Sequence, residues 1–303
     1  MQLLKQLCSI HAPSGNESAM TEFLIDYIIK RKSSWKVHPK IYYGEGFQNC
    51  IVLVFGKPRT AIYAHIDSIG FTVRYSNQLV RIGGPHAESG TILVGADSKG
   101  MVECTLEEDE KGNYSYKSKR EIERGTDLTY KPNFREDDDF IQCCYMDNRL
   151  GVWNALKVAE TLENGAIVFS CWEEHGGGSV PFLSKFLYEK YHVHQALVSD
   201  ITWITEGVHH GQGVVVSMRD TGIPRRIFIN KIIALAKQSG IPYQLEVEGS
   251  GGSDGTELQK QPYPIDWCFI GAGEDHVHSP DEKVHKKDID AMVEMYRYLM
   301  KQL

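Results

Sequence analysis

Apolar residues follow two spacings along the 303-residue chain. Short unbroken apolar runs, rich in β-branched residues, predict buried strands over residues 50–55, 61–66, 166–172, 196–200, 243–247 and 267–270. Apolar residues at helical intervals predict helices over residues 148–162, 179–191, 224–238 and 288–303. An earlier helix is predicted to start at Ser14-Gly-Asn-Glu17, which has the spacing of a capping box. This alternation predicts an α/β fold with a mostly parallel central sheet and helices on both faces.

The stretch from residue 68 to residue 140 has a different pattern. Its glycines are frequent, its apolar runs are short, and acidic charge clusters at 107–111 and 136–139. We expect a small β-rich, barrel-like domain here. It would interrupt a catalytic α/β domain made of residues 1–67 and 141–303.

Composition excludes several classes of protein. Hydrophobic residues make up 42% and charged residues 24%, as in ordinary globular proteins, and no apolar stretch approaches the roughly 20 residues of a membrane span. The net charge of -7 argues against nucleic acid as a partner. The amino terminus lacks the apolar core of a secretory signal. Seven cysteines without a Cys-x-x-Cys pair indicate a reducing, cytoplasmic location.

Acidic and imidazole side chains follow the predicted strands. His65 and Asp67 follow one strand, Glu173 and Glu174 end a second, and Asp200 closes a third. Functional residues of open α/β sheets gather at such strand ends. Each residue alone is explained by a cap, a turn or a core contact, but two adjacent glutamates at a buried strand end repel each other unless cations compensate them. The set predicts a two-metal hydrolase site made of His65, Asp67, Asp147, Glu173, Glu174, Asp200 and His278.

Five motifs in sequence order carry a family resemblance. They are Ala64-His65-Ile-Asp67-Ser-Ile-Gly70-Phe71, Met146-Asp147-Asn148-Arg149-Leu-Gly151, Trp172-Glu173-Glu174-His-Gly176, Val198-Ser-Asp200 and His278-Ser279-Pro280. With them the chain resembles the M42 family of metallo-aminopeptidases, whose members form tetrahedral, self-compartmentalising particles. The segment Gly251-Gly252-Ser253-Asp254 is also similar to that family's Gly-Gly-Thr-Asp.

The resemblance implies a role for each candidate. Asp147 would bridge two divalent metal ions, with His65 and Asp200 completing one set of ligands and Glu174 and His278 the other. Glu173 would be the general base, and Asp67 would accept a hydrogen bond from the second nitrogen of His65. A cis peptide bond would join Asp147 to Asn148. Mixed histidine and carboxylate ligands suit zinc or cobalt and also accept manganese. Short peptides would lose their amino-terminal residues, and the chain would form a homo-oligomer such as a tetrahedral dodecamer.

Three alternatives stay open. The related M20 carboxypeptidases and deacylases share the metal-site pattern, but their accessory domain lies between the motif of Asp200 and the last histidine, whereas the β-rich stretch here lies between Asp67 and Asp147. An amidase acting on small non-peptide amides is a second alternative. A non-catalytic, metal-stabilised assembly protein is the third, although no ligand or base is missing.

Several features leave their roles undecided. Ser68 stands where the M42 family often has Glu, and His175-Gly-Gly-Gly178 replaces a more usual Val-Gly-x-x-Gly. Both changes bear on substrate preference more than on catalysis. His209 and His276 fit either a substrate loop or a surface turn. The predicted insertion is compact for the family, which bears on the assembly.

Overall fold

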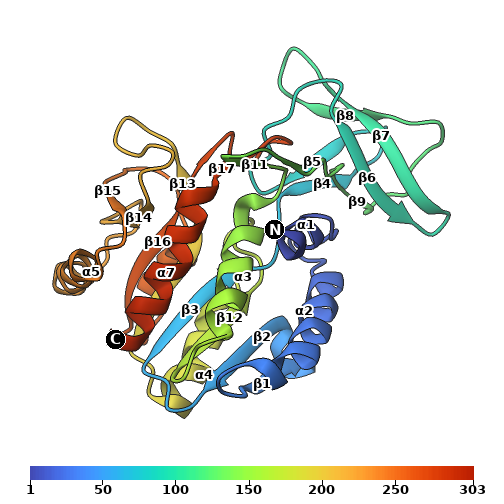
Figure 1. Cartoon of the computed structure of the whole chain (residues 1–303). Helices are drawn as coiled ribbons and strands as arrows, with labels where there is room; N and C mark the ends of the chain where they lie inside the picture. Colours follow the sequence, from blue (N-terminus) through green and yellow to red (C-terminus); the bar gives the residue numbers. More distant parts are fainter.

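The structure, a computed structural model, describes residues 1–303 and contains two β-sheets of different character. The larger sheet has eleven strands and forms the body of the molecule, and the smaller has six strands and stands at one end of it (Figure 1). No helix is both long enough and apolar enough to pass through a bilayer. All seven cysteines are free and buried.

The larger sheet is parallel at its centre. Its strands are β1 (Lys40–Gly44), β2 (Gln48–Phe55), β3 (Thr60–His65), β10 (Arg135–Glu136), β11 (Phe140–Gln142), β12 (Gly165–Ser170), β13 (Gln195–Trp203), β14 (Val214–Ser217), β15 (Tyr243–Glu246), β16 (Asp266–Asp275) and β17 (Lys283–His285). The order is β1-β2-β12-β3-β13-β16-β17-β11-β10, with β14 and β15 branching from β16. β3 runs parallel to β12 and β13, and β13 runs parallel to β16. The predicted mostly parallel sheet is confirmed, although its two margins are antiparallel.

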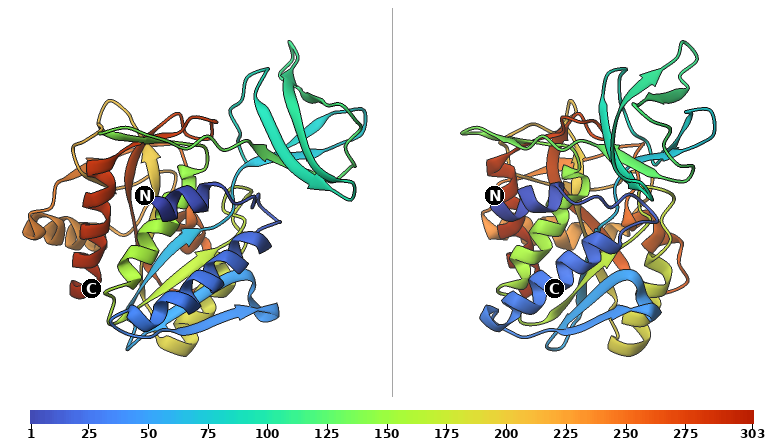
Figure 2. Two further views of the ribbon diagram at one scale, coloured as in Figure 1. Left: turned by 45° about the vertical axis from the view of Figure 1, so that its right-hand side comes forward. Right: turned by 90° about the vertical axis from the view of Figure 1, so that its right-hand side faces the viewer.

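Helices cover both faces of this sheet, as predicted. They are α1 (Gln2–Cys8), α2 (Ser18–Arg31), α3 (Met146–Ala159), α4 (Val180–Tyr191), α5 (Arg226–Ser239), α6 (Asp254–Lys260) and α7 (Lys286–Gln302), with short 3-10 turns η1 (Lys32–Ser34) and η2 (Glu45–Phe47). α3 and α7 pack together on one face, and α4 lies on the opposite face with α6 (Figure 2). Tyr296 of α7 is buried and donates its hydroxyl to the carbonyl groups of Val198 and Ile270, at 2.6 and 2.8 Å, which ties α7 to two central strands.

The predicted capping box at Ser14 is wrong. α2 begins at Ser18, and the Ser14 hydroxyl instead donates to Asp67, 2.6 Å away. The carboxylate of Glu17 is fully buried and accepts hydrogen bonds from the Gly15 N–H and the Asn49 amide. Contacts with distant strands therefore override the local capping pattern.

The smaller sheet is antiparallel and barrel-like. Its strands are β4 (Gly70–Val73), β5 (Leu79–Ile82), β6 (Ile92–Asp97), β7 (Gly100–Glu108), β8 (Tyr114–Lys117) and β9 (Asp127–Tyr130). They follow the order β5-β4-β9-β6-β7-β8, and a bridge between Gln78 and Ser115 brings the two margins together. β10 and β11 begin before residue 141 but pair in the larger sheet, and the domain boundaries at 67 and 140 stay predictions.

The barrel packs against the larger unit through apolar side chains. Tyr130 of β9 stacks on Tyr145, which precedes α3, with ring centroids 6.0 Å apart. The Tyr145 hydroxyl also donates to the carbonyl of Tyr130. Buried apolar residues of both units belong to one continuous cluster. The end of the larger sheet that faces the barrel is also where the candidate residues gather.

Candidate metal centre and the adjoining cavity

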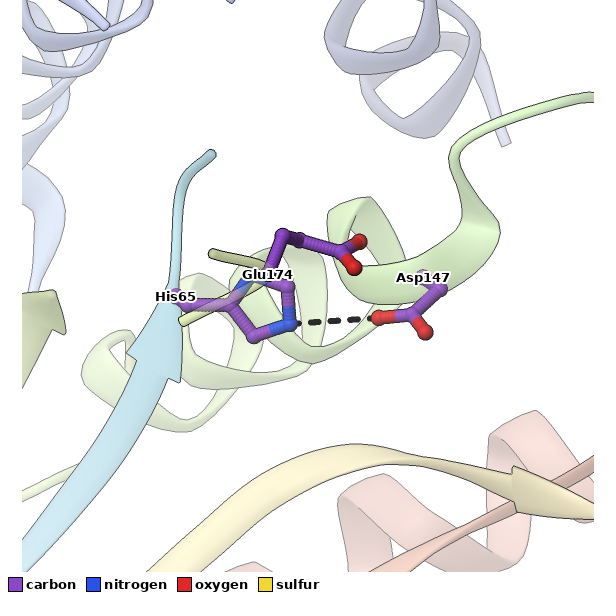
Figure 3. A group of neighbouring side chains, drawn as sticks. All are labelled: His65, Asp147 and Glu174. Carbon is purple, nitrogen blue, oxygen red and sulfur yellow. Dashed lines mark hydrogen bonds and ion pairs between the residues drawn. The ribbon is translucent and has the colours of Figure 1, made fainter. Parts of the chain in front are cut away.

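His65 lies at the end of β3, between two parallel neighbours, and is 1% exposed. The short apolar run that precedes His65 forms a central, buried strand. The imidazole therefore lies in the interior, at the carboxyl edge of the sheet. Its Nε2 lies 3.1 Å from Asp147 Oδ1 (Figure 3). The same nitrogen lies 3.5 Å from Asp200 Oδ2 and 3.9 Å from Glu173 Oε2. Strands β3 and β13, the start of α3 and the turn after β12 therefore meet at one point.

Asp147 faces two histidines with its two oxygens. Oδ1 faces His65, and Oδ2 lies 3.3 Å from His278 Nε2. The same Nε2 of His278 lies 3.1 Å from Glu174 Oε2. One carboxylate thus stands between two sets of neighbours, as expected of a ligand shared by two cations.

The backbone at the start of α3 is unusual. The peptide bond between Asp147 and Asn148 is cis, as the family resemblance implies. The Asn148 side chain donates to the Ser199 carbonyl and accepts from the Gly151 N–H, both at 2.9 Å. A Cβ at Gly151 would lie 2.1 Å from Asn148 Oδ1 and from the Ser199 carbonyl oxygen, so this position requires glycine.

Asp67 holds the segment that carries the two glutamates. Its carboxylate accepts hydrogen bonds from the backbone N–H groups of Glu173 and Glu174, at 3.2 and 3.1 Å, and from the Ser14 hydroxyl. The expected hydrogen bond with His65 is not formed, because Nδ1 lies 3.5 Å from Asp67 Oδ1 and has no hydrogen-bond partner. Burial opposes the charge of Asp67, but the nearby imidazole and the hydroxyl and N–H donors outweigh it and lower the pKa of this carboxyl.

His278 is oriented by the barrel. Its Nδ1–H donates to the carbonyl of Gly84, at 3.1 Å, so Nε2 is left to face the centre. The carbonyl of His278 accepts hydrogen bonds from the Tyr130 hydroxyl and the His86 N–H, at 3.1 and 2.9 Å. Tyr130 of β9 and two residues of the loop between β5 and β6 thus fix the ring and the backbone of a candidate ligand.

The centre contains more carboxylate side chains than its imidazoles can neutralise. Burial raises the pKa of Glu173 and Asp200 well above the ordinary range, and it also raises the pKa of Glu174, where the charge of Asp147 adds to the effect. Burial opposes protonation of His278, but Glu174 and Asp147 outweigh it and raise its pKa to about 12. Bound cations relieve such electrostatic repulsion among carboxylates.

These residues fit divalent metal ions. Ligand atoms of His65, Asp147 and Glu174 lie within 4.8 Å of one another, and Asp200 and His278 flank them. The buried Glu174 Oε1 has no hydrogen-bond partner. Two imidazoles and three carboxylates are a donor set that zinc, cobalt and manganese accept.

Three buried charged residues near the centre were not predicted from the sequence. Arg149 is fully buried and donates to the carbonyls of Ile66 and Asp67. Glu282 is 1% exposed and accepts the backbone N–H groups of Asp147 and His278. Glu274, near the end of β16, is equally buried and neither of its oxygens has a partner. The only available signal was their proximity in sequence to the candidate ligands or to a strand end.

A cavity of about 290 Å³ opens from the centre. It is lined by Asp147, Glu173, Glu174, Asp200, Ile201, Thr202, Trp203, Asp220, Glu246, Glu248, Ser250, Gly251, Gly252, Phe269, Val277 and His278. No lysine or arginine is among them. The motifs along the chain indicated the carboxylates of the centre but not those of the far part of the cavity.

The undecided histidines lie outside this cavity. His276 lines a separate hollow beside the barrel with His86. The glycine-rich turn after His209 is held structurally, because the N–H groups of Gly211 and Gly213 both donate to Asp288 at 2.7 Å.

Comparison with known proteins identifies the family. A family model described as M42 glutamyl aminopeptidase matches residues 109–295. The chain therefore belongs to the M42 peptidase family, and it is an enzyme that hydrolyses peptide bonds. The M42 resemblance noted in the sequence is confirmed, and the M20 family is not the one to which the chain belongs.

Solved structures share the whole fold. The chain is similar to a TET aminopeptidase from a marine sediment archaeon of the Thaumarchaeota, with 18% identity, a TM-score of 0.87 and coverage of 100% of this chain and 97% of the other. An aminopeptidase of the archaeon Desulfurococcus kamchatkensis is 20% identical, with a TM-score of 0.86 and coverage of 100% of this chain and 94% of the other. The TET1 peptidase of Pyrococcus horikoshii is 20% identical, with a TM-score of 0.82 and coverage of 100% of this chain and 99% of the other. At these identities the likeness concerns the fold.

Proposed function

We propose that the chain is an aminopeptidase that works with two divalent metal ions, zinc or cobalt in the first place and manganese as a third option. The proposed ligands are His65, Asp147 and Asp200 for one ion and Asp147, Glu174 and His278 for the other. The observation that carries this proposal is the position of Asp147, whose two carboxylate oxygens face two different histidines.

The residues of the chain supply proton transfer and alignment. When bound, the ions would acidify a water molecule and polarise the peptide carbonyl. Glu173 accepts the proton of the attacking water and returns it to the leaving amine. Burial raises the pKa of Glu173, which makes its carboxylate a stronger base. Asp67 keeps Glu173 and Glu174 in register through their backbone N–H groups.

The charge of the cavity favours the amino end of a peptide. Beyond the proposed ligands and Glu173, the carboxylates of Asp220, Glu246 and Glu248 line the cavity, and no lysine or arginine does. A protonated α-amine is attracted to such a lining, and a terminal carboxylate is repelled. This asymmetry favours an aminopeptidase over a carboxypeptidase or a deacylase of acylated amino acids.

The decisive experiment compares Glu173→Gln with the wild type. Metal content and the rate on aminoacyl p-nitroanilides are measured on the same samples, with zinc, cobalt or manganese added. We expect the variant to keep its metal and lose turnover, whereas Glu206→Gln, at an exposed loop position, keeps both. An undiminished rate in Glu173→Gln removes that residue from the mechanism. A metal-loaded wild type without activity on any amide supports the non-catalytic alternative, and preference for acylated amino acids supports a deacylase.

We also propose a homo-oligomer in the reducing cytoplasm. The TET1 peptidase of Pyrococcus horikoshii, which shares the fold, can assemble into a tetrahedron or a large octahedral shell. On this chain Ile223 and Ile227 are 60% and 70% exposed near the start of α5, which leaves apolar surface for a neighbouring subunit. Seven free cysteines suit a reducing compartment. Light scattering after size-exclusion chromatography distinguishes a dodecamer from a monomer or dimer.

A further inference from the structure

The far part of the cavity carries three carboxylates that the proposed mechanism does not use. Glu246 is the last residue of β15, Glu248 lies two residues further along the chain, and Asp220 lies in the loop after β14. We call these three residues the acidic wall. They line the same cavity as Asp147 and His278, so a substrate bound at the centre reaches them.

No basic side chain forms an ion pair with the acidic wall, although the charge of Arg219 acts on Asp220. Glu246 is 4% exposed and Asp220 is 8% exposed, and no ion pair joins either of them or Glu248 to a basic side chain within 4.0 Å. Arg219 is the nearest arginine in the sequence, but its Nε donates to the backbone carbonyl of Asp220. Buried carboxylates are normally paired or bound to a cation.

Only one oxygen of Glu246 is hydrogen-bonded. Its Oε1 accepts the Thr202 hydroxyl, and Oε2 has no hydrogen bond. One oxygen of Asp220 accepts the Gly222 N–H within a tight turn, which leaves the other unpaired. The wall therefore has acceptors left over for a donor that enters the cavity.

The electrostatics of the wall favour an incoming cation. Burial raises the pKa of Glu246, the neighbouring hydroxyls of Thr202 and Ser217 oppose this shift, and the charges of Glu248 and Asp220 add to it. Burial likewise raises the pKa of Asp220. A positive group between Glu246 and Asp220 would lower the pKa of both carboxyls, whereas a negative group would add to the repulsion.

The same cavity offers apolar surface. Trp203, Phe269 and Val277 line it, and the indole of Trp203 closes over Gly251, where a Cβ would lie 3.3 Å from the ring. A side chain with a methylene stem and a charged end matches this combination of apolar and acidic surface.

We propose that the acidic wall selects substrates whose amino-terminal residue is lysine or arginine, the cationic side chain lying between Asp220, Glu246 and Glu248 while the scissile bond lies at the centre. The inference rests on the aminopeptidase function proposed above. It departs from the glutamyl preference in the description of the matching family, because a glutamyl side chain would meet three like charges.

Lysyl and norleucyl p-nitroanilides provide a matched test, because norleucine keeps the stem of lysine and lacks the ammonium group. We expect the wild-type enzyme to have a kcat/KM for the lysyl substrate at least about tenfold higher than for the norleucyl one, with the glutamyl substrate cleaved slowest. Glu246→Gln should lower this lysyl-to-norleucyl ratio by about tenfold. Glu206→Gln, which removes an exposed charge from the loop after β13, should leave the ratio unchanged.

Two further measurements keep the test decisive. Glu248→Gln changes a half-buried residue and should lower the ratio even if Glu246→Gln does not fold. Calorimetry with free lysine and free norleucine reports binding without turnover and should show tighter binding of lysine. Equal kcat/KM values for the lysyl and norleucyl substrates, with equal affinities for free lysine and free norleucine, overturn the inference. The aminopeptidase function would still stand. If no aminoacyl substrate is cleaved, the proposed function fails, and lysine binding still decides whether the wall recognises cations.

Discussion

The carboxylate of Glu282 accepts a hydrogen bond from the backbone N–H of Asp147, with Oε2 3.2 Å from the nitrogen. Its other oxygen accepts the N–H of His278 at 3.1 Å. The proposed shared ligand, Asp147, and the proposed ligand His278 are thereby both hydrogen-bonded to one buried side chain. Glu282 positions these ligands without facing the cavity.

Glu282→Gln should weaken metal binding, because an amide offers only one acceptor oxygen and turns an N–H donor toward another N–H group. Loss of such supporting contacts typically lowers metal affinity about 10–100-fold. Competition with a chromogenic chelator measures the change. Asp281→Asn is the control, since Asp281 is exposed and pairs with Arg135 at the surface. Identical affinities in Glu282→Gln and wild type would mean that the ligands keep their places without this carboxylate.

Asp67→Asn should lower kcat more than Ser14→Ala does. The first variant disturbs the acceptor of two backbone N–H groups at Glu173 and Glu174, and we expect a loss of about 10–100-fold. The second removes only the hydroxyl donor and should cost about 1 kcal/mol of stability. Steady-state kinetics and thermal melts separate the two effects. Equal losses of kcat would place the importance of Asp67 in its link to Ser14.

Asp147→Ala should lose both metal ions together, because both proposed ligand sets share this carboxylate. In the wild type, each metal ion at 100 times its dissociation constant should add about 2.7 kcal/mol of stability, and a chelator should remove this stabilisation. The variant should show neither bound metal nor a metal-dependent shift in melting temperature. Asp138→Ala, in an exposed loop, should behave as wild type. One ion retained at full occupancy would contradict the shared role.

Glu274→Gln should stabilise the metal-free protein increasingly as pH rises. Burial, together with the charges of Glu282 and Asp147, raises the pKa of Glu274 well above its ordinary value of about 4.3. The folded state then keeps a proton that the unfolded state loses, so stability falls as pH increases from about 4.3 toward the folded pKa. Gln does not titrate and escapes this loss. Between pH 4 and pH 8, the melting temperatures of the variant and the wild type should diverge by about 2–4 °C for each kcal/mol of difference in unfolding free energy. If the two curves stay parallel, Glu274 is charged in the folded protein.

The elements that the sequence predicted well are those that depend on neighbours along the chain. Unbroken apolar runs identified β3 and β13. His65 ends β3 as predicted, but Asp200 does not close its strand, because β13 continues to Trp203. The residues that escaped prediction owe their roles to distant partners. Arg149 fills a buried position against the backbone of the turn after β3, and Glu246 meets the cavity only because β15 pairs beside β14. No local pattern encodes such pairings, and the capping role predicted for Ser14 is wrong for the same reason.

The barrel cannot be treated as a detachable module. Its Gly84 carbonyl accepts a hydrogen bond from Nδ1 of His278 and so turns Nε2 toward the centre, and its Tyr130 hydroxyl donates to the backbone carbonyl of the same residue. A shortened chain that joins β3 directly to α3 would keep most of the acidic centre and lose control of one imidazole. Relatives that differ in this insertion are therefore expected to differ in catalysis as well as in shape.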